Sequence, residues 1–155
     1  MHSIEIFTDG SCHTQLRIGA WAAIVFVDKE KTVLTGHEEN TTHNRMELFA
    51  IISAIEFIQQ NFPASKSIHV ITDSQYAVGL IGRENKFKER NFHTKAGVEI
   101  QNADLVKRFL TLMTETHFSV EKIKAHQKKL IDKDNFNIEA DKRCRKILRD
   151  LVGSK

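Results

Sequence analysis

The sequence predicts an α/β fold built on a mixed five-stranded sheet with helices on its faces. Segments with the two-residue alternation of strands are interspersed with segments whose apolar residues recur every three or four positions, as in helices. Their order is three strands, a helix, a strand, helices, a strand and a helix. Hydrophobic residues make up 41% of the 155 residues and charged residues 28%, which suits a single domain over residues 1–155 with one core.

Three strands are predicted in the N-terminal part of the chain. Ile4 and Ile6 alternate with polar neighbours, and this first strand is expected to end at residues 9–10. The apolar run at residues 19–28 is typical of a second strand, and a third is expected at residues 31–38.

A helix of about four or five turns follows from Asn44. Its apolar stripe consists of Leu48, Ile51, Ile55, Ile58 and Phe62. Pro63 is the only proline in the chain and ends the helix, because proline lacks the backbone N–H that a helix needs. Thr42 is expected to cap the first turn.

The fourth strand is predicted at residues 67–72. A crossover helix precedes it, so pairing parallel to the first strand is expected. Residues 74–81 read as a short helix, and a basic segment dotted with aromatic residues comes next.

The C-terminal part of the chain adds two helices and a strand. Apolar spacing over residues 105–113 predicts one helix, with Asn102 as its expected cap. A last strand is expected at residues 118–124. The inner stripe of the final helix consists of Ala140, Cys144, Ile147, Leu148 and Leu151.

Composition excludes several classes of protein. No apolar run approaches the ~18 residues of a membrane-spanning helix, and the N-terminus enters a strand without the pattern of a secretory signal. Cys12 and Cys144 are too few for a disulfide scaffold and lack the paired spacing of a zinc site. A reducing, cytoplasmic location is expected.

Basic charge is concentrated in the second half of the chain, although the net charge is only +3. Residues 83–95 hold five basic side chains against two acids, residues 122–133 five against one, and residues 142–149 five against none. This distribution favours a polyanionic partner such as nucleic acid, although charge runs on helices are usually solvated faces.

Four carboxylates are expected at one edge of the sheet. Asp9 and Asp73 stand at the ends of the first and fourth strands, whose parallel pairing would bring them together where open α/β sheets bind ligands. Glu47 and Asp141 lie on the inner sides of their helices. Taken alone, each acid has an ordinary explanation as a turn former, a cap or a complement to a helix dipole.

The conjunction of the four acids indicates a metal site. Carboxylates gathered at one edge repel one another unless cations neutralise them. Hard oxygen ligands, with no histidine or cysteine cluster nearby in the sequence, select Mg²⁺ or Mn²⁺ over zinc. Acids beside lysines are typical of metal-assisted phosphate chemistry.

The acids lie in four short motifs: TDGSC at residues 8–12, TTHNRMEL at 41–48, TDSQY at 72–76 and NIEAD at 137–141. In order and spacing these resemble the acidic motifs of bacterial type 1 ribonuclease H, and the resemblance runs from about residue 4 to residue 148. It implies a ribonuclease H-like fold and hydrolysis of the RNA strand of RNA–DNA hybrids, leaving 5′-phosphate and 3′-hydroxyl ends.

By this resemblance, Asp9, Glu47, Asp73 and Asp141 are catalytic and hold two Mg²⁺ ions, with Mn²⁺ as an alternative. Asp9 is expected to bridge both ions, and Asp141 to be the most loosely held ligand. His126 occupies the position of the family's loop histidine, which is thought to assist proton transfer or product release. Its ordinary alternative is a solvated loop histidine.

The resemblance also assigns substrate contacts. Family positions that touch the RNA or flank its groove are matched by Cys12, His43, Asn44 and Gln75. Positions that hold a DNA phosphate are matched by Thr42 and Asn102.

Residues 83–96 resemble the basic protrusion of many bacterial members. The residues expected to contact the nucleic-acid backbone, in a way that depends on salt, are Lys86, Lys88 and Arg90. Phe87 and Phe92 stand where the family often has tryptophans lining the DNA channel, and the alternative is that they form the protrusion's own small core.

The sequence departs from the family pattern in two loops. Residues 13–19 replace a Gly/Pro-rich loop, so no RNA contact is carried over there. Ala125 stands where glycine is common, and about five extra residues fall within residues 127–136.

Two alternatives to a hybrid-specific nuclease stay open. A related nuclease or transposase would keep the fold and change the target, although a transposase is disfavoured because no additional DNA-binding domain is expected. A nucleic-acid-binding module would keep the acids without turnover. The expected partner is an RNA–DNA hybrid. Binding to a membrane or to an organic cofactor is not expected, and the protein is expected to be a monomer.

Overall fold

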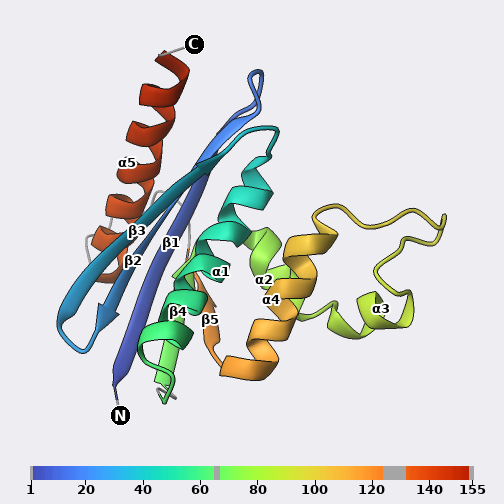
Figure 1. Cartoon of the computed structure of the whole chain (residues 1–155), viewed down its shortest axis with the longest axis horizontal. Coiled ribbons are helices and arrows are strands. Elements are labelled where there is room, and N and C mark those ends of the chain that lie inside the picture. The colour runs from blue at the N-terminus through green and yellow to red at the C-terminus, as the bar shows by residue number, and fades with distance from the viewer. Residues whose placement is uncertain (1, 65–66, 124–131, 154–155) are drawn as a thin grey trace.

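A five-stranded sheet in the order β3-β2-β1-β4-β5 forms the centre of the computed structural model, which describes residues 2–64, 67–123 and 132–153 (Figure 1). The strands are β1 (Ser3–His13), β2 (Ile18–Val27), β3 (Glu30–Glu38), β4 (Ser67–Thr72) and β5 (Ser119–Lys122). The first three pair antiparallel, while β4 and β5 run parallel to β1. The α/β class and the mixed sheet predicted from the sequence are confirmed.

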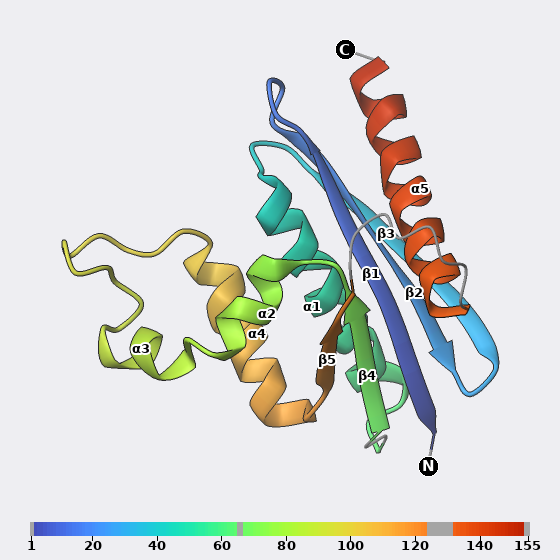
Figure 2. The ribbon, with the colours of Figure 1, turned by 180° about the vertical axis from the view of Figure 1, so that it is seen from behind.

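Helices cover both faces of this sheet. They are α1 (His43–Asn61), α2 (Gln75–Ile81), α3 (Glu84–Glu89), α4 (Ala103–Thr116) and α5 (Asp132–Gly153). α1 and α4 lie on one side of the sheet and α5 lies alone on the other (Figures 1 and 2). In the described ranges, no helix is both long enough and apolar enough to span a membrane.

The alternation of β1 divides the apolar residues between two cores. Successive side chains of a strand point to opposite faces. Ile4 and Ile6 therefore pack with the α1 and α4 side of the sheet, whereas Phe7 packs with Ala140 and Cys144 of α5. Both cores are needed to hold the sheet between its helices.

The ends of α1 follow the sequence signals. The hydroxyl of Thr42 accepts a hydrogen bond from the backbone N–H of Arg45 at 3.2 Å, as an N-cap does. The helix ends at Asn61, two residues before Pro63. Both predictions for this helix are confirmed.

Arg45 ties the first turn of α1 to its neighbours. Its Nε donates to Glu38 of β3 at 2.7 Å, and its terminal nitrogens donate to both carboxylate oxygens of Asp104 in α4 at 2.9 and 2.8 Å. The hydrogen bonds from Arg45 lower the pKa of Asp104. Bidentate pairs of this kind fix orientation as well as distance, so α1 and α4 start side by side.

The structure corrects three details of the sequence prediction. β1 does not end at residues 9–10 but continues to His13, because β2 pairs with it along its whole length and satisfies its backbone. α3 was not predicted as a helix. Asn102 precedes α4 in a left-handed conformation and does not cap it with its side chain, which donates instead to the Tyr76 hydroxyl at 3.2 Å.

Candidate active site

Asp9 and Asp73 lie at the same edge of the sheet. The parallel pairing of β1 with β4 ends at Phe7 and Ile71, and each aspartate lies two residues beyond that pair. Asp9 remains in β1, opposite Ala22 of β2, and is only 6% exposed. The longer β1 therefore leaves the predicted convergence of the two carboxylates intact.

Gly10 determines how closely α1 approaches β1. A Cβ added to Gly10 would lie 2.5 Å from the backbone nitrogen of Glu47 and 2.6 Å from the carbonyl carbon of Met46. A residue without a side chain is therefore required for the first turn of α1 to lie against the strand. This close approach brings Glu47, which is 2% exposed, beside Asp9 and Asp73, with ligand oxygens of all three within 4.8 Å of one another.

Asp141 approaches Asp9 from α5 on the other face of the sheet. Asp9, Asp141 and Cys144 offer ligand atoms within 4.8 Å of one another. The Cys144 thiol lies 4.0 Å from Oδ2 of Asp9 and donates to the backbone carbonyl of Asp141 at 3.3 Å. The fourth predicted acid thus joins the other three.

All four acids line one pocket of about 290 Å³. The described residues that line it are Asp9, Gly10, Ser11, His43, Asn44, Glu47, Asp73, Ser74, Gln75, Tyr76, Asp141 and Arg145. They come from β1, α1, the segment that joins β4 to α2, the first turn of α2, and α5. Elements far apart in the sequence therefore supply one compact acidic site.

Two acids in this pocket, Asp9 and Glu47, bind protons more tightly than isolated carboxylates. Burial, followed by repulsion from Glu47 and Asp73, raises the pKa of Asp9 to about 10. Burial and the charge of Asp73 raise the pKa of Glu47 to about 8. Oε2 of Glu47 is buried without a hydrogen-bond partner among the described residues. Such a site is unfavourable when ionised and is stabilised by bound cations.

The donor set fits a hard divalent cation. Carboxylate oxygens are the ligands that Mg²⁺ and Mn²⁺ prefer. The thiol of Cys144 also lies beside the acids, which the sequence analysis did not predict. Its position three residues after Asp141, on the inner stripe of the same helix, could have indicated this. Burial, with repulsion from Asp9 and Asp141, raises the pKa of this thiol, which favours its protonated form in the metal-free protein.

Two cationic or protonatable side chains contact the acids. Nε2 of His43 lies 3.0 Å from Oε1 of Glu47, one helical turn away. Nε of Arg145 donates to Oδ1 of Asp141 at 3.0 Å. Arg145 was missed in the sequence analysis, and its signal was the four-residue spacing from Asp141 on a predicted helix.

The predicted RNA contacts fall into two groups. His43, Asn44 and Gln75 line the acidic pocket. Cys12 lies further along β1, and its thiol donates to the carbonyl of Thr41 at 3.6 Å, while burial raises its pKa. Thr42, predicted to hold a DNA phosphate, is exposed and also caps α1.

The predicted protrusion lies apart from the pocket. Its residues fall on α3 and the following loop, which extend away from the sheet beyond α4 (Figures 1 and 2). Phe87 is 6% exposed, and its ring stacks on that of Phe92 at 6.1 Å. Lys86, Lys88 and Arg90 are exposed. Their role and that of Asn102 in DNA binding stay predictions.

His126 and residues 127–131 lie outside the described residues. The prediction that this histidine assists proton transfer or product release therefore stays a prediction.

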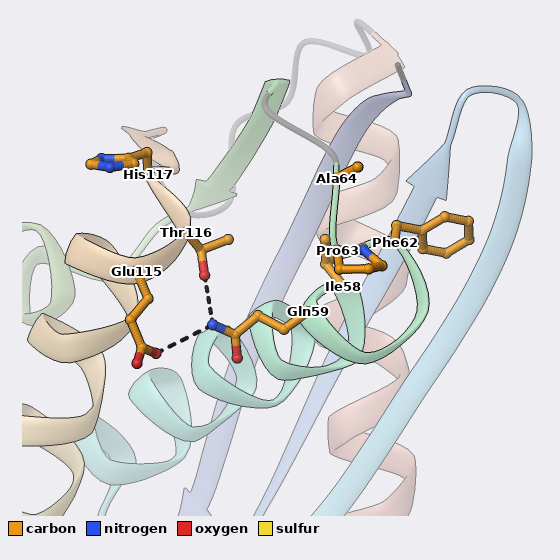
Figure 3. A pocket seen from close by; sticks show the side chains of 8 residues that line it. All are labelled: Ile58, Gln59, Phe62, Pro63, Ala64, Glu115, Thr116 and His117. Carbon is orange, nitrogen blue, oxygen red and sulfur yellow. Dashed lines mark hydrogen bonds between the residues drawn. The ribbon is translucent and has the colours of Figure 1, made fainter.

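A larger cavity lies at the other end of α1. It measures about 620 Å³ and opens between the C-terminal ends of α1 and α4 (Figure 3). Across it, the amide of Gln59 donates to Thr116 at 2.8 Å and to Glu115 at 3.3 Å. Among the described residues that line this cavity, none was a predicted site residue. Its size alone does not make it the active site.

Comparison with known proteins gives a consistent result. The sequence model of the RNase H family matches residues 1–148. A ribonuclease H of Caldicellulosiruptor saccharolyticus is 33% identical over 153 residues, which cover 97% of this chain and 99% of that protein. One from a Wolbachia endosymbiont of Drosophila simulans is 32% identical, covering 95% and 96%. One from a Bradyrhizobium species is 37% identical, covering 79% and 78%.

Proposed function

The chain belongs to the ribonuclease H family of hydrolases, and from this premise we propose that it cleaves the RNA strand of RNA–DNA hybrids. Water attacks the phosphorus atom and the bond to the 3′ oxygen breaks, which leaves 5′-phosphate and 3′-hydroxyl ends. The observation that carries the proposal is the convergence of four acids from separate elements in one pocket. We propose that residues 1–155 form one catalytic domain.

Asp9, Glu47, Asp73 and Asp141 are the proposed ligands of two divalent ions, Mg²⁺ or Mn²⁺. Two such ions, when bound, would activate the attacking water and stabilise the leaving 3′ oxygen. We propose Asp9 as the ligand common to both ions. Its oxygens lie close to those of Glu47 and Asp73 and also close to those of Asp141. The ion pair of Asp141 with Arg145 supports its assignment as the weakest ligand.

The remaining pocket residues orient the substrate in this proposal. The polar side chains of His43, Asn44 and Gln75 line the pocket beside the acids, and we propose that they contact 2′-hydroxyls of the RNA strand. Contact with a 2′-hydroxyl distinguishes RNA from DNA. Cys12 flanks this groove, Thr42 and Asn102 hold DNA phosphates, and His126 assists proton transfer or product release.

The protrusion is the proposed binding surface for the DNA strand. Lys86, Lys88 and Arg90 contact its phosphates. Phe87 and Phe92 stack on each other, which supports a role in the protrusion's own core, and the half-buried Phe92 is the one proposed to reach the DNA channel. We propose that the enzyme works as a monomer in the cytoplasm, where its two unpaired cysteines stay reduced.

Asp73→Asn tests the proposal. The variant loses cleavage by roughly 10²–10³-fold or more, because a ligand is lost where transition-state charge develops. Its affinity for the hybrid is unchanged or higher, because a repulsive charge is removed. Asp150→Asn, the same change on an exposed part of α5, retains full activity. If Asp73→Asn binds and cleaves as the wild type does, the assignment of the metal site is wrong.

A further inference from the structure

The exposed side of α5 carries an unusual density of positive charge. Between Lys142 and Arg149 the helix holds five basic residues and no acid, and all five are exposed. The protrusion, where basic residues were expected to bind DNA, lies on the other side of the sheet with α4 (Figures 1 and 2). The charge on α5 therefore forms a separate surface.

Three of these residues form a line along α5, and the middle one lines the acidic pocket. Lys142, Arg145 and Arg149 are three and four positions apart, so they share one face of the helix. We name them the α5 stripe. Arg145 lines the acidic pocket, and Cys144 on the inner face of the same turn contacts Asp9. The stripe is thus continuous with the active site.

Internal ion pairs do not account for the stripe. Arg143, on the other flank, donates to Glu139 at 2.8 Å, and Glu139 also accepts from Lys31 of β3 at 2.8 Å. In contrast, Lys142 and Arg149 form no ion pair with any residue in the described part of the chain. Arg145 alone in the stripe has a carboxylate partner, Asp141.

Stabilisation of the helix dipole does not account for it either. That effect acts within the last turn of a helix. The last turn of α5 contains no basic residue, and Arg149 is followed by Asp150. The basic residues lie instead in the C-terminal half of the helix, before its last turn.

We propose that the α5 stripe binds backbone phosphates of the hybrid beyond those held at the acidic pocket, and so lengthens the contact with the duplex. This inference rests on the proposed function. Arg149 lies eight residues after Asp141, about 12 Å further along the helix axis. That distance corresponds to roughly three or four base pairs at ~3.4 Å each. Guanidinium and ammonium groups are well suited to phosphate oxygens.

Charge reversal on the stripe tests the inference with hybrids of two lengths. The test variant is Lys142→Glu with Arg149→Glu, which leaves Arg145 and the acids unchanged. The control is Lys29→Glu with Arg143→Glu, which changes the net charge equally in the β2–β3 turn and on the other flank of α5. A hybrid of about 24 base pairs extends past the stripe, whereas a hairpin hybrid of about 4 base pairs, with about two on each side of the cleaved phosphate, ends before Arg149. Binding is measured by fluorescence anisotropy in EDTA, and cleavage with Mg²⁺.

The expected result depends on length and salt. When KCl is raised from about 50 to 200 mM, the affinity of the wild type for the long hybrid should fall about tenfold more than the affinity of the test variant. The variant is less sensitive to salt because it has lost two phosphate contacts. The test variant raises KM for the long hybrid and leaves kcat unchanged, and it cleaves the short hybrid as the wild type does. The control matches the wild type on both hybrids.

Two outcomes would overturn the inference. One is an equal salt dependence for wild type and test variant on the long hybrid, and the other is an equal loss of affinity in test and control variants. Failure of the proposed function is recognised separately, because the wild type would then cleave neither hybrid.

Discussion

At the scale of single residues, the acidic pocket is governed by competition between protons and cations. Asp9 and Glu47 are buried beside one another, and their pKa values rise to about 10 and about 8. In the absence of cations both carboxyls therefore retain protons at neutral pH. Divalent ions must displace these protons, so metal binding and stability depend on pH together.

The stability of the metal-free protein should therefore fall as pH rises. Both pKa values are raised above those of the unfolded chain, near 4, so their contribution is fully present below about pH 4. It is lost as pH rises through about 8 and then about 10. Saturating Mg²⁺ should raise the free energy of unfolding by about 2–3 kcal/mol, and by more at pH 8.5 than at pH 5.5.

Thermal unfolding at these two pH values checks this prediction. The difference between Tm in Mg²⁺ and Tm in EDTA should increase by several degrees from pH 5.5 to pH 8.5. Asp9→Asn serves as the control, because it removes the group with the largest pKa shift and should reduce this increase. An equal Mg²⁺ effect at both pH values would contradict the account of the pocket.

Gly10 is a second residue on which the site depends. Gly10→Ala places a methyl group within 2.5–2.6 Å of the backbone of α1, so the helix must move away from β1 and Glu47 moves with it. We expect a loss of about 1–3 kcal/mol of stability and a marked loss of activity. Denaturant unfolding and hybrid cleavage measure the two effects.

Gly79→Ala is the matched control for Gly10. Gly79 lies inside α2, and an added Cβ there meets nothing within 4 Å. Alanine should stabilise the protein by about 0.4–1 kcal/mol, because it reduces the freedom of the unfolded chain. If Gly10→Ala were as harmless as Gly79→Ala, the close approach of α1 to β1 would not be what positions Glu47.

At the scale of elements, the protrusion is a small unit with its own packing. Arg83 lies over the ring of Phe87 at 4.8 Å and Lys107 over the ring of Phe92 at 5.2 Å. Because Phe92 also stacks on Phe87, the contact with Lys107 links the protrusion to α4, while Lys86 and Arg90 are exposed. The protrusion therefore exposes positive charge on a segment that is held in place by packing.

Charge reversal at Lys86, Lys88 and Arg90 should act on binding and leave the chemistry unchanged. We expect KM to rise and its dependence on salt to weaken, with a slope smaller by about 2–3 for three phosphate contacts, and kcat to stay nearly constant. Steady-state cleavage at several KCl concentrations measures both constants. A parallel loss of kcat would mean that this element also positions the reacting phosphate.

Individual elements differ in how well local sequence predicts them. α1 was predicted from its apolar spacing, its Thr42 cap and Pro63, all of which act within the helix itself. β1 was predicted too short because its last four residues are held by β2, a partner that local alternation does not reveal. α3 is short and polar, and it depends on the burial of Phe87 in tertiary contacts.

At the scale of the whole molecule, the order of elements was sufficient to predict the mixed sheet. Parallel pairing of β1 with β4 follows from the crossover through α1, and it brings Asp9 and Asp73 to one edge. The proximity of Cys144 and Arg145 to that edge was not predicted, because it depends on how α5 lies across the second face. Packing of this kind is set by contacts between distant segments.

The central claim is metal-dependent cleavage of the RNA strand of a hybrid. Its most direct test is incubation of labelled RNA annealed to DNA, beside single-stranded RNA, double-stranded RNA and double-stranded DNA, each with Mg²⁺ and with EDTA. We predict cleavage of the hybrid's RNA strand alone, only with Mg²⁺, leaving 5′-phosphate and 3′-hydroxyl ends. Tight binding of the hybrid without cleavage of any substrate in Mg²⁺ or Mn²⁺ would contradict the claim and identify a binding module.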